Sequence, residues 1–187
     1  MSVELRNYDS RGYSAGAGIA KRVLWYAVNA LFFHSWLHLG SPLKCALLRV
    51  FGARVGAHVV IKPRVNVKYP WHLEIADDVW IGEDVWLDSL ARISIASNVC
   101  ISQGAYLLTG NHDYTDLAFG LIVKPIIVEE GAWVGARAVV CPGAKIGRHA
   151  VVTVGSVLTR NAEADGIYVG NPARSVKSRK IREAPGA

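Results

Sequence analysis

Aliphatic residues recur at every sixth position through most of the chain, which matches neither the helical period of about 3.6 residues nor the strand period of about two. The series is Val55, Ile61, Val67, Leu73, Ile75, Ile81, Leu87, Ile93, Ile95, Ile101 and Leu107, and then Val128, Val134, Val140, Ile146, Val152 and Leu158. Four positions after most members stands a small or β-branched residue, and a glycine often follows a member directly. This period fits a coil of three short strands whose aliphatic side chains fill a narrow prism. The pattern predicts a stack of such coils, an all-β solenoid.

The spacing between equivalent positions predicts how these coils stack. Two coils, 55–75 and 75–95, have 20 residues each, and the later coils have 18. Strands of neighbouring coils would lie roughly 4.8 Å apart and satisfy each other's backbone groups. A β-sandwich would need turn signals every ~8–12 residues and polar–apolar alternation, and the sequence shows neither.

The repeat divides the chain into three parts, and we expect a cap at the solenoid end because open strand edges must be covered. Residues 1–50 form an N-terminal helical segment, residues 51–163 form the β-helix, and residues 164–187 form a short C-terminal tail rich in Lys and Arg. The apolar region 14–50 is the predicted cap.

The most apolar stretch of the cap, Val23–Leu39, has three interpretations. It is shorter than the ~20 residues of a membrane span, and polar residues interrupt it. As a signal peptide it starts late and lacks a convincing cleavage site. We favour a helix packed on its own domain or on a neighbouring subunit. Peripheral contact of residues 19–39 with an anionic inner leaflet stays open as an alternative.

Composition narrows the class of protein further. Apolar residues make up 51% of the chain, which excludes extended disorder. The net charge of +6 suits an anionic partner, and by itself it does not choose among nucleic acid, a membrane surface and an anionic cofactor. The cysteines Cys45, Cys100 and Cys141 form no CxxC pair. Their number and spacing argue against a disulfide framework and favour a reducing, cytoplasmic setting.

The repeat breaks between Leu107 and Val128, which predicts a loop over residues 108–127 at one corner of the solenoid. Long loops in compact domains usually carry function. This loop contains His112 between Asn111 and Asp113.

Four features together resemble the hexapeptide-repeat acetyltransferases: the six-residue repeat, the loop TGNHD, the run EGAWVGARAVVCPGAKIGRHAVV and the ending GNPAR. Within that family the chain is most similar to colanic-acid-type exopolysaccharide O-acetyltransferases, and more distantly to galactoside and maltose O-acetyltransferases. The resemblance implies a left-handed parallel β-helix and a homotrimer with active sites between neighbouring β-helices. It also implies acetyl-CoA as co-substrate, a sugar or glycan as acceptor, no metal and no nucleic acid.

The resemblance places the family's catalytic histidine at His112. An imidazole with an ordinary pKa near ~6.5 is largely neutral at cellular pH and accepts a proton from a hydroxyl. The oxygen would then attack the thioester directly, without a nucleophilic cysteine.

The resemblance also implies binding residues. Asn111 and Trp133 map to acceptor contacts, and the alternative for Trp133 is an aromatic at a subunit contact. Asp88 precedes the loop by one coil, so we expect it to share the corner of the loop and to bind hydroxyls of the acceptor; its alternative is a solvated carboxylate at a corner. Cofactor contacts map to Ala136, Val154, Thr159, Arg160, Arg174 and Lys177. The chain departs from the family at 161–165, where a proline-rich turn is expected, and this puts the shape of the adenine pocket in doubt.

Other functions on the same fold stay open at this point. An N-acetyltransferase of a nucleotide amino sugar has a similar frame, and a non-catalytic structural solenoid would need no loop histidine. A γ-type carbonic anhydrase needs three histidines converging on zinc. The close pair here, His34 and His38, lies in the predicted cap, which argues against that enzyme.

Overall fold

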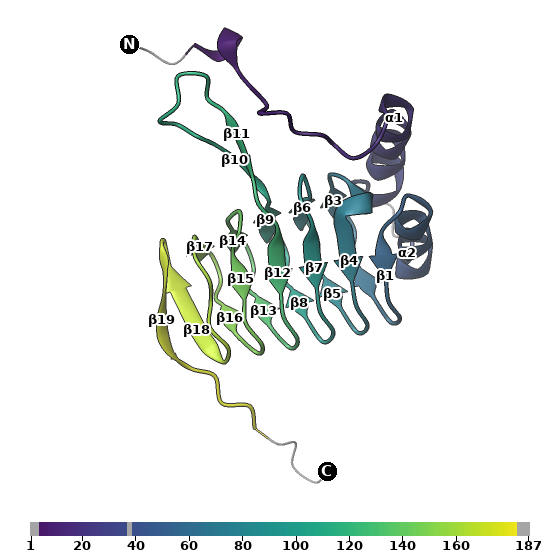
Figure 1. Cartoon of the computed structure of the whole chain (residues 1–187). Coiled ribbons are helices and arrows are strands. Elements are labelled where there is room, and N and C mark those ends of the chain that lie inside the picture. The colour runs from purple at the N-terminus through teal and green to yellow at the C-terminus, as the bar shows by residue number, and fades with distance from the viewer. Residues whose placement is uncertain (1–3, 37–38, 183–187) are drawn as a thin grey trace.

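The computed structural model describes residues 4–36 and 39–182, and its main body is a parallel β-solenoid with three flat faces (Figure 1). Sheet A contains β1 (Arg54–Val55), β4 (Leu73–Ile75), β7 (Ile93–Ile95), β12 (Ile126–Val128) and β15 (Lys145–Ile146). Sheet B contains β2 (Val60–Ile61), β5 (Trp80–Ile81), β8 (Cys100–Ile101), β13 (Trp133–Val134) and β16 (Val151–Val152), followed by β18 (Gly166–Gly170) and β19 (Ala173–Ser178). Sheet C contains β3 (Asn66–Val67), β6 (Trp86–Asp88), β9 (Tyr106–Leu108), β14 (Val139–Val140) and β17 (Val157–Leu158).

The core confirms the predicted six-residue repeat. Every aliphatic residue of the series is buried, except Val55 in the first coil, which is half-buried. Equivalent residues stack in register, as Leu87 does on Leu107. The register continues across the inserted loop, where Ile95 pairs with Val128. The prism is therefore a continuous apolar column.

Where the chain passes from sheet A to sheet B, or from sheet B to sheet C, the corner is turned by a residue in the left-handed region, three positions after an interior aliphatic residue. Asp84 (φ 58°) and Gly104 (φ 67°) are two examples. The glycines that directly follow an aliphatic residue serve a different purpose. A Cβ on Gly82 would lie 2.6 Å from the backbone nitrogen of Gln103 in the next coil, so only glycine fits at this approach.

The N-terminal cap differs from the single helix predicted over 23–39. Helix α1 (Ile19–Val28) continues as a π-helical turn, η2 (Asn29–Phe33), and a separate helix α2 (Ser41–Val50) follows; residues 37–38 lie outside the described part. The helical turns end at Phe33 instead of Leu39, and the favoured packing of this stretch on its own domain is confirmed. One face packs on the first coil, where Trp25 is buried and its Nε1 donates to the carbonyl of Val67 at 2.9 Å.

Helix α2 buries a charged side chain against the first coil. The Lys44 side chain is buried, which lowers its pKa, and its Nζ donates to the carbonyl of Lys62 at 2.7 Å. None of the helices in the described part of the chain is long and apolar enough to cross a membrane.

Three further segments decorate the solenoid. Residues 4–18, which include the short helix η1 (Leu5–Asn7), cross from the inserted loop to α1, and we call them the N-terminal strap (Figure 1). The inserted loop is an antiparallel hairpin of β10 (Gly110–His112) and β11 (Leu121–Val123). The predicted tail forms the β18–β19 hairpin, whose first strand extends sheet B, while 183–187 lie outside the described residues.

Candidate active site

The hairpin that carries His112 leaves the solenoid at the edge where sheet C turns toward sheet A. Its base is anchored by the buried Thr109, whose Oγ1 donates to the carbonyl of Asp88 at 2.7 Å and accepts from the nitrogen of Ala91 at 2.9 Å. The nitrogen of Lys124 donates back to the carbonyl of Thr109 at 2.9 Å. The hairpin therefore stands on the same corner as Asp88, as the sequence predicted.

The imidazole of His112 is held on several sides. Its Nδ1 lies 3.1 Å from the carbonyl oxygen of Phe119, and because a carbonyl only accepts, Nδ1 carries the proton. The Phe119 ring stacks on the imidazole at 4.4 Å, and the Tyr8 ring meets it edge-on at 5.6 Å. The Asn111 Oδ1 accepts from the backbone nitrogen of His112 at 2.8 Å. In the neutral ring, Nε2 then holds the lone pair and is the basic atom.

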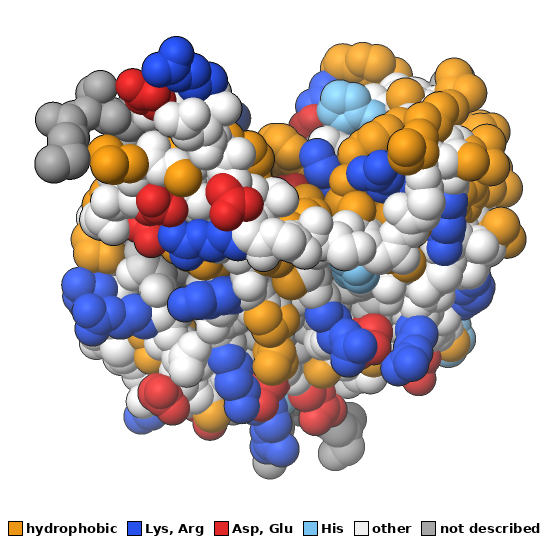
Figure 2. Space-filling model, turned by 45° about the horizontal axis from the view of Figure 1, so that its top comes forward, with side chains coloured by type: hydrophobic (Ala, Val, Ile, Leu, Met, Phe, Trp, Pro, Cys, Tyr) orange, Lys and Arg blue, Asp and Glu red, His pale blue; other side chains and the backbone are white. Residues whose placement is uncertain are grey.

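Asp88 ends β6 beside aromatic rings. Burial raises the pKa of its carboxyl, while the nearby Lys68 and a 3.4 Å hydrogen bond from the Tyr106 hydroxyl act in the opposite direction. Burial and the Asp88 charge raise the pKa of Tyr106 to about 12, and the Trp86 ring stacks on Tyr106 at 4.6 Å. A carboxylate beside aromatic rings offers an acceptor for hydroxyl groups and an apolar surface on which a ligand can pack. Figure 2 shows a hollow between the hairpin side and the helical side of the molecule.

A second group of predicted residues comes together on sheet B. Trp133, Ala136 and Val154 line a hollow of about 440 Å³, together with Ser102 and Gln103. The indole Nε1 of Trp133 donates to Ser102 Oγ at 2.8 Å, which fixes the ring across the strands. Sequence reasoning missed Ser102 because its hydroxyl lies one coil away from Trp133.

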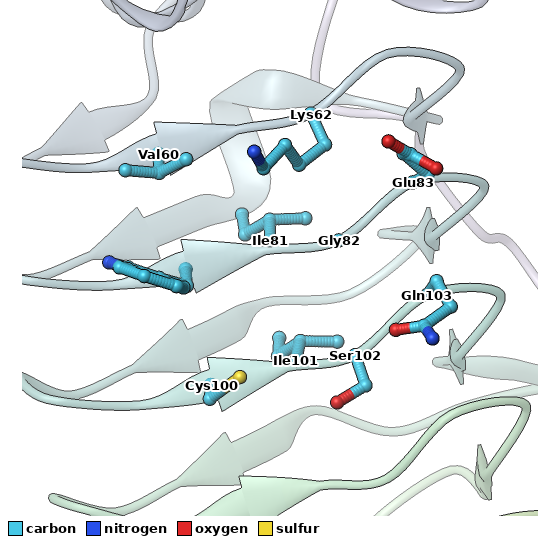
Figure 3. A pocket seen from close by; sticks show the side chains of 10 residues that line it. Val60, Lys62, Ile81, Gly82, Glu83, Cys100, Ile101, Ser102 and Gln103 are labelled. Atoms are coloured by element: carbon cyan, nitrogen blue, oxygen red, sulfur yellow. The ribbon is translucent and has the colours of Figure 1, made fainter.

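This hollow continues toward the N-terminal coils. A neighbouring hollow of about 320 Å³ shares Ser102 and Gln103 with it and adds Lys62 and Glu83 near the corner and Cys100 on its strand (Figure 3). The two hollows form a groove along sheet B.

The two groups of predicted residues lie on different sides of the prism. Asp88, Asn111 and His112 lie at the edge between sheets C and A, where Thr159 and Arg160 also follow β17. The groove lies on sheet B, opposite that edge. A single chain therefore does not bring Trp133 to the other predicted acceptor contacts, Asp88 and Asn111, and the predicted cofactor contacts are divided in the same way.

The remaining predicted contacts lie at the end of the solenoid. Arg174 and Lys177 are exposed on β19, the last strand of sheet B. Burial raises the pKa of the Cys141 thiol, which disfavours a reactive thiolate. Across residues 4–36 and 39–182, no group of three His, Cys, Asp or Glu side chains is arranged to hold a metal ion.

Comparison of the sequence with known proteins identifies relatives of this chain. No protein-family model matches the chain. The Escherichia coli protein WcaF, assigned to colanic acid biosynthesis as an acetyltransferase, is 37% identical over 169 residues, which cover 90% of this chain and 92% of WcaF.

Solved structures agree with this relationship. A hexapeptide-repeat acetyltransferase of Vibrio cholerae is 27% identical with a TM-score of 0.77, covering 87% of this chain and 92% of that protein, and it has also been solved with acetyl-CoA. A maltose O-acetyltransferase of Clostridium difficile is 21% identical, and the two chains share the fold with a TM-score of 0.80 over 97% and 99% of their lengths. The chain belongs to the hexapeptide-repeat acetyltransferases and is an acyltransferase.

Proposed function

We propose that this enzyme transfers the acetyl group of acetyl-CoA to a hydroxyl of a sugar or glycan in exopolysaccharide biosynthesis, with His112 as general base. The observation that carries the proposal is the bond from His112 Nδ1 to the Phe119 carbonyl, which leaves Nε2 as the basic atom. The acetyl-CoA complex of the Vibrio cholerae relative supports the donor. The Escherichia coli relative of colanic acid biosynthesis and the Clostridium difficile maltose O-acetyltransferase support a saccharide acceptor.

His112 would act twice in this reaction. Its Nε2 accepts the proton of the acceptor hydroxyl while that oxygen forms a bond to the thioester carbon. The carbon–sulfur bond then breaks, and the imidazolium returns the proton to the departing sulfur, so that free CoA and an acetyl ester result. A backbone N–H beside the thioester would stabilise the oxyanion. Asp88 would orient the acceptor by accepting from its other hydroxyls.

The groove on sheet B would hold the donor. Trp133, Ala136 and Val154 offer a largely apolar wall for the pantetheine arm. Basic residues for the anionic phosphates stand beyond it, at Arg174 and Lys177 on β19, and Thr159 and Arg160 would approach from a neighbouring copy.

The division of the site supports a homotrimer. His112 and the groove lie on opposite sides of one prism, and in the proposed assembly a second copy places its hairpin against the first copy's groove. Three prisms arranged head to tail close such a set of contacts. Light scattering should give about 61 kDa, three times the 20.3 kDa chain mass. A mass near 20 kDa at working concentrations contradicts the trimer.

An acceptor panel tests the reaction itself. CoA release with free sugars, oligosaccharides and nucleotide amino sugars measures the acceptor class. Mild base removes an O-acetyl ester and leaves an N-acetyl amide, so the lability of the product separates the proposed O-transfer from N-transfer. A product stable to base would contradict the proposal.

We also propose that the cap rests on the anionic inner leaflet from the cytoplasmic side. Ile19, Leu31 and Trp36 are 71%, 62% and 81% exposed, on the strongly apolar helical side of the molecule (Figure 2). Lys21 lies on the same helix as Ile19, with its ammonium over the Trp71 ring at 4.8 Å. Because the other face of the cap packs on the first coil, the test uses point changes on the exposed face. Ile19→Ser with Leu31→Ser should abolish sedimentation with anionic vesicles and leave acetylation of a soluble sugar unchanged, whereas wild-type protein that ignores these vesicles contradicts the idea.

A further inference from the structure

The N-terminal strap lies directly on the hairpin that carries His112. The nitrogen of Asp9 donates to the carbonyl of Ala118 at 3.3 Å, and the carbonyl of Asp9 accepts from the nitrogen of Leu121 at 3.2 Å. Leu121 is the residue that pairs with His112 across the hairpin. The strap thus acts as a third chain segment beside the two strands of the hairpin.

Arg11 connects the strap to the turn of the hairpin. Its Nη2 donates to Asp116 Oδ2 at 2.8 Å and to Asp113 Oδ2 at 3.4 Å. Its guanidinium also lies against the backbone of Gly120, where an added Cβ would collide with it. The hydrogen bond from Arg11 lowers the pKa of Asp116. The guanidinium of Arg11 therefore links Asp113, at the start of the turn, to Asp116.

Asp113 and Asp116 are directly connected to His112 and to Phe119, the hydrogen-bond partner of His112. Asp113 directly follows His112, and the carbonyl of Asp116 accepts from the nitrogen of Phe119 at 2.9 Å. Phe119 has φ of +50°, a left-handed conformation that is unfavourable for a bulky side chain and persists only where the surroundings hold it. The carbonyl and ring of Phe119 are the groups that orient the imidazole.

We propose that Arg11 is a positioning residue for catalysis, which holds the 113–119 turn so that the Phe119 carbonyl keeps the proton of His112 on Nδ1. This inference rests on the proposed role of His112 as general base. Loss of Arg11 would let Phe119 leave its left-handed conformation, and the imidazole would lose the acceptor that fixes its tautomer.

A positioning role differs measurably from a structural one. The ion pairs of Arg11 are solvent-exposed, and such pairs contribute little to global stability. A misplacement of about 1 Å at a catalytic group, by contrast, can cost about a hundredfold in rate. Removal of Arg11 should therefore reduce kcat without unfolding the protein.

The test compares Arg11→Ala with Arg6→Ala, a matched change in the same strap, because Arg6 pairs with Glu4 and not with the hairpin. Arg11→Ala should lower kcat about ten- to a hundredfold, with the KM for acetyl-CoA and the Tm unchanged. Arg11→Lys, which keeps the charge but not the fork, should recover part of the loss. Arg6→Ala should retain wild-type kcat.

Nitrogen-15 spectra of histidine-labelled protein provide the direct readout. The His112 signals are identified by their loss in His112→Ala. Wild-type protein should show a protonated Nδ1, and Arg11→Ala a mixture of the two tautomers. Wild-type kcat in Arg11→Ala, or reduced kcat with an unchanged imidazole spectrum, overturns the inference.

Two further variants keep the outcomes distinct. Asp116→Asn removes the carboxylate instead of the cation, so it should reproduce the tautomer mixture even if Arg11→Ala folds poorly. An unchanged spectrum in Asp116→Asn contradicts the inference. If His112→Ala keeps full turnover, the proposed general base is wrong; if it is inactive while Arg11→Ala is fully active, only the positioning role fails.

Discussion

Leu107 and His112 lie close together in the chain, yet the contacts that fix them differ in kind. Leu107 stacks on Leu87 in the coil before and on Val140 in the coil after, so its neighbours are the equivalent residues of the repeat. His112 is held by Phe119 within the hairpin and by Tyr8 at the far end of the chain. The stability of the solenoid thus comes from the same kind of apolar contact repeated in each coil. The position of the catalytic candidate depends on contacts that occur once.

His112→Ala is the sharpest way to break this comparison. Turnover should fall by about 10²–10⁴, the usual loss of a general base. The Tm should not change, because the contacts of the side chain lie in the hairpin and the strap and not in the coils. Initial rates of CoA release and a thermal melt measure both effects. His58→Ala, at an exposed corner, is the control and should keep wild-type turnover.

Leu107→Ala should show the opposite behaviour. Its side chain is fully buried, so truncation should cost about 2–5 kcal/mol of unfolding free energy. Ile127→Ala is a matched change on an outward face, where the side chain is 44% exposed, and should cost less than about 1.5 kcal/mol. Urea titrations of the two variants measure the difference. Equal losses would mean that the interior column does not carry the stability.

Asp88→Asn tests whether the Asp88 carboxylate favours acceptor binding and lowers the stability of the folded protein. Loss of a charged hydrogen-bond acceptor should lower kcat/KM for the sugar about ten- to a hundredfold. Burial raises the pKa of Asp88 in the folded state, so its ionised form opposes folding. The variant should therefore be the more stable protein at neutral pH, and the advantage should disappear as pH falls through the raised pKa toward the ordinary value of 3.8. Thermal melts that show the same advantage of the variant at every pH in this range would contradict the assignment.

Lys145→Ala should have the smallest effect. Its ammonium lies 2.6 Å from Glu129 on the surface of the solenoid, and an exposed pair contributes about 0–1 kcal/mol. The hydrogen bond from Lys145 lowers the pKa of Glu129. The small contribution should be present above the ordinary Glu pKa of 4.5 and lost as pH falls through the lowered value. Matched melts at neutral and acid pH, in low and high salt, measure it.

The difference between the repeated contacts of the coils and the single contacts of the hairpin explains what the sequence could predict. An interior position such as Leu107 has the same environment in each coil, so the repeat itself predicts its burial and register. The corner shared by Asp88 and the hairpin followed from counting coils. The contacts of Arg11 did not, because they depend on a segment about a hundred residues away that leaves no periodic signal. The β18–β19 hairpin was missed because its strands lie beyond the last full coil.

The closed base of the hairpin has a consequence for how this protein can change. Lys124 donates to Thr109, so the two ends of the insertion meet much as the two sides of an ordinary corner do. The coils before and after continue in register, with Ile95 on Val128. Closing a longer loop between such fixed ends costs only about 0.6 kcal/mol for each doubling of its length. At this corner, therefore, one catalytic insertion can be exchanged for another while the coils of the solenoid keep their register.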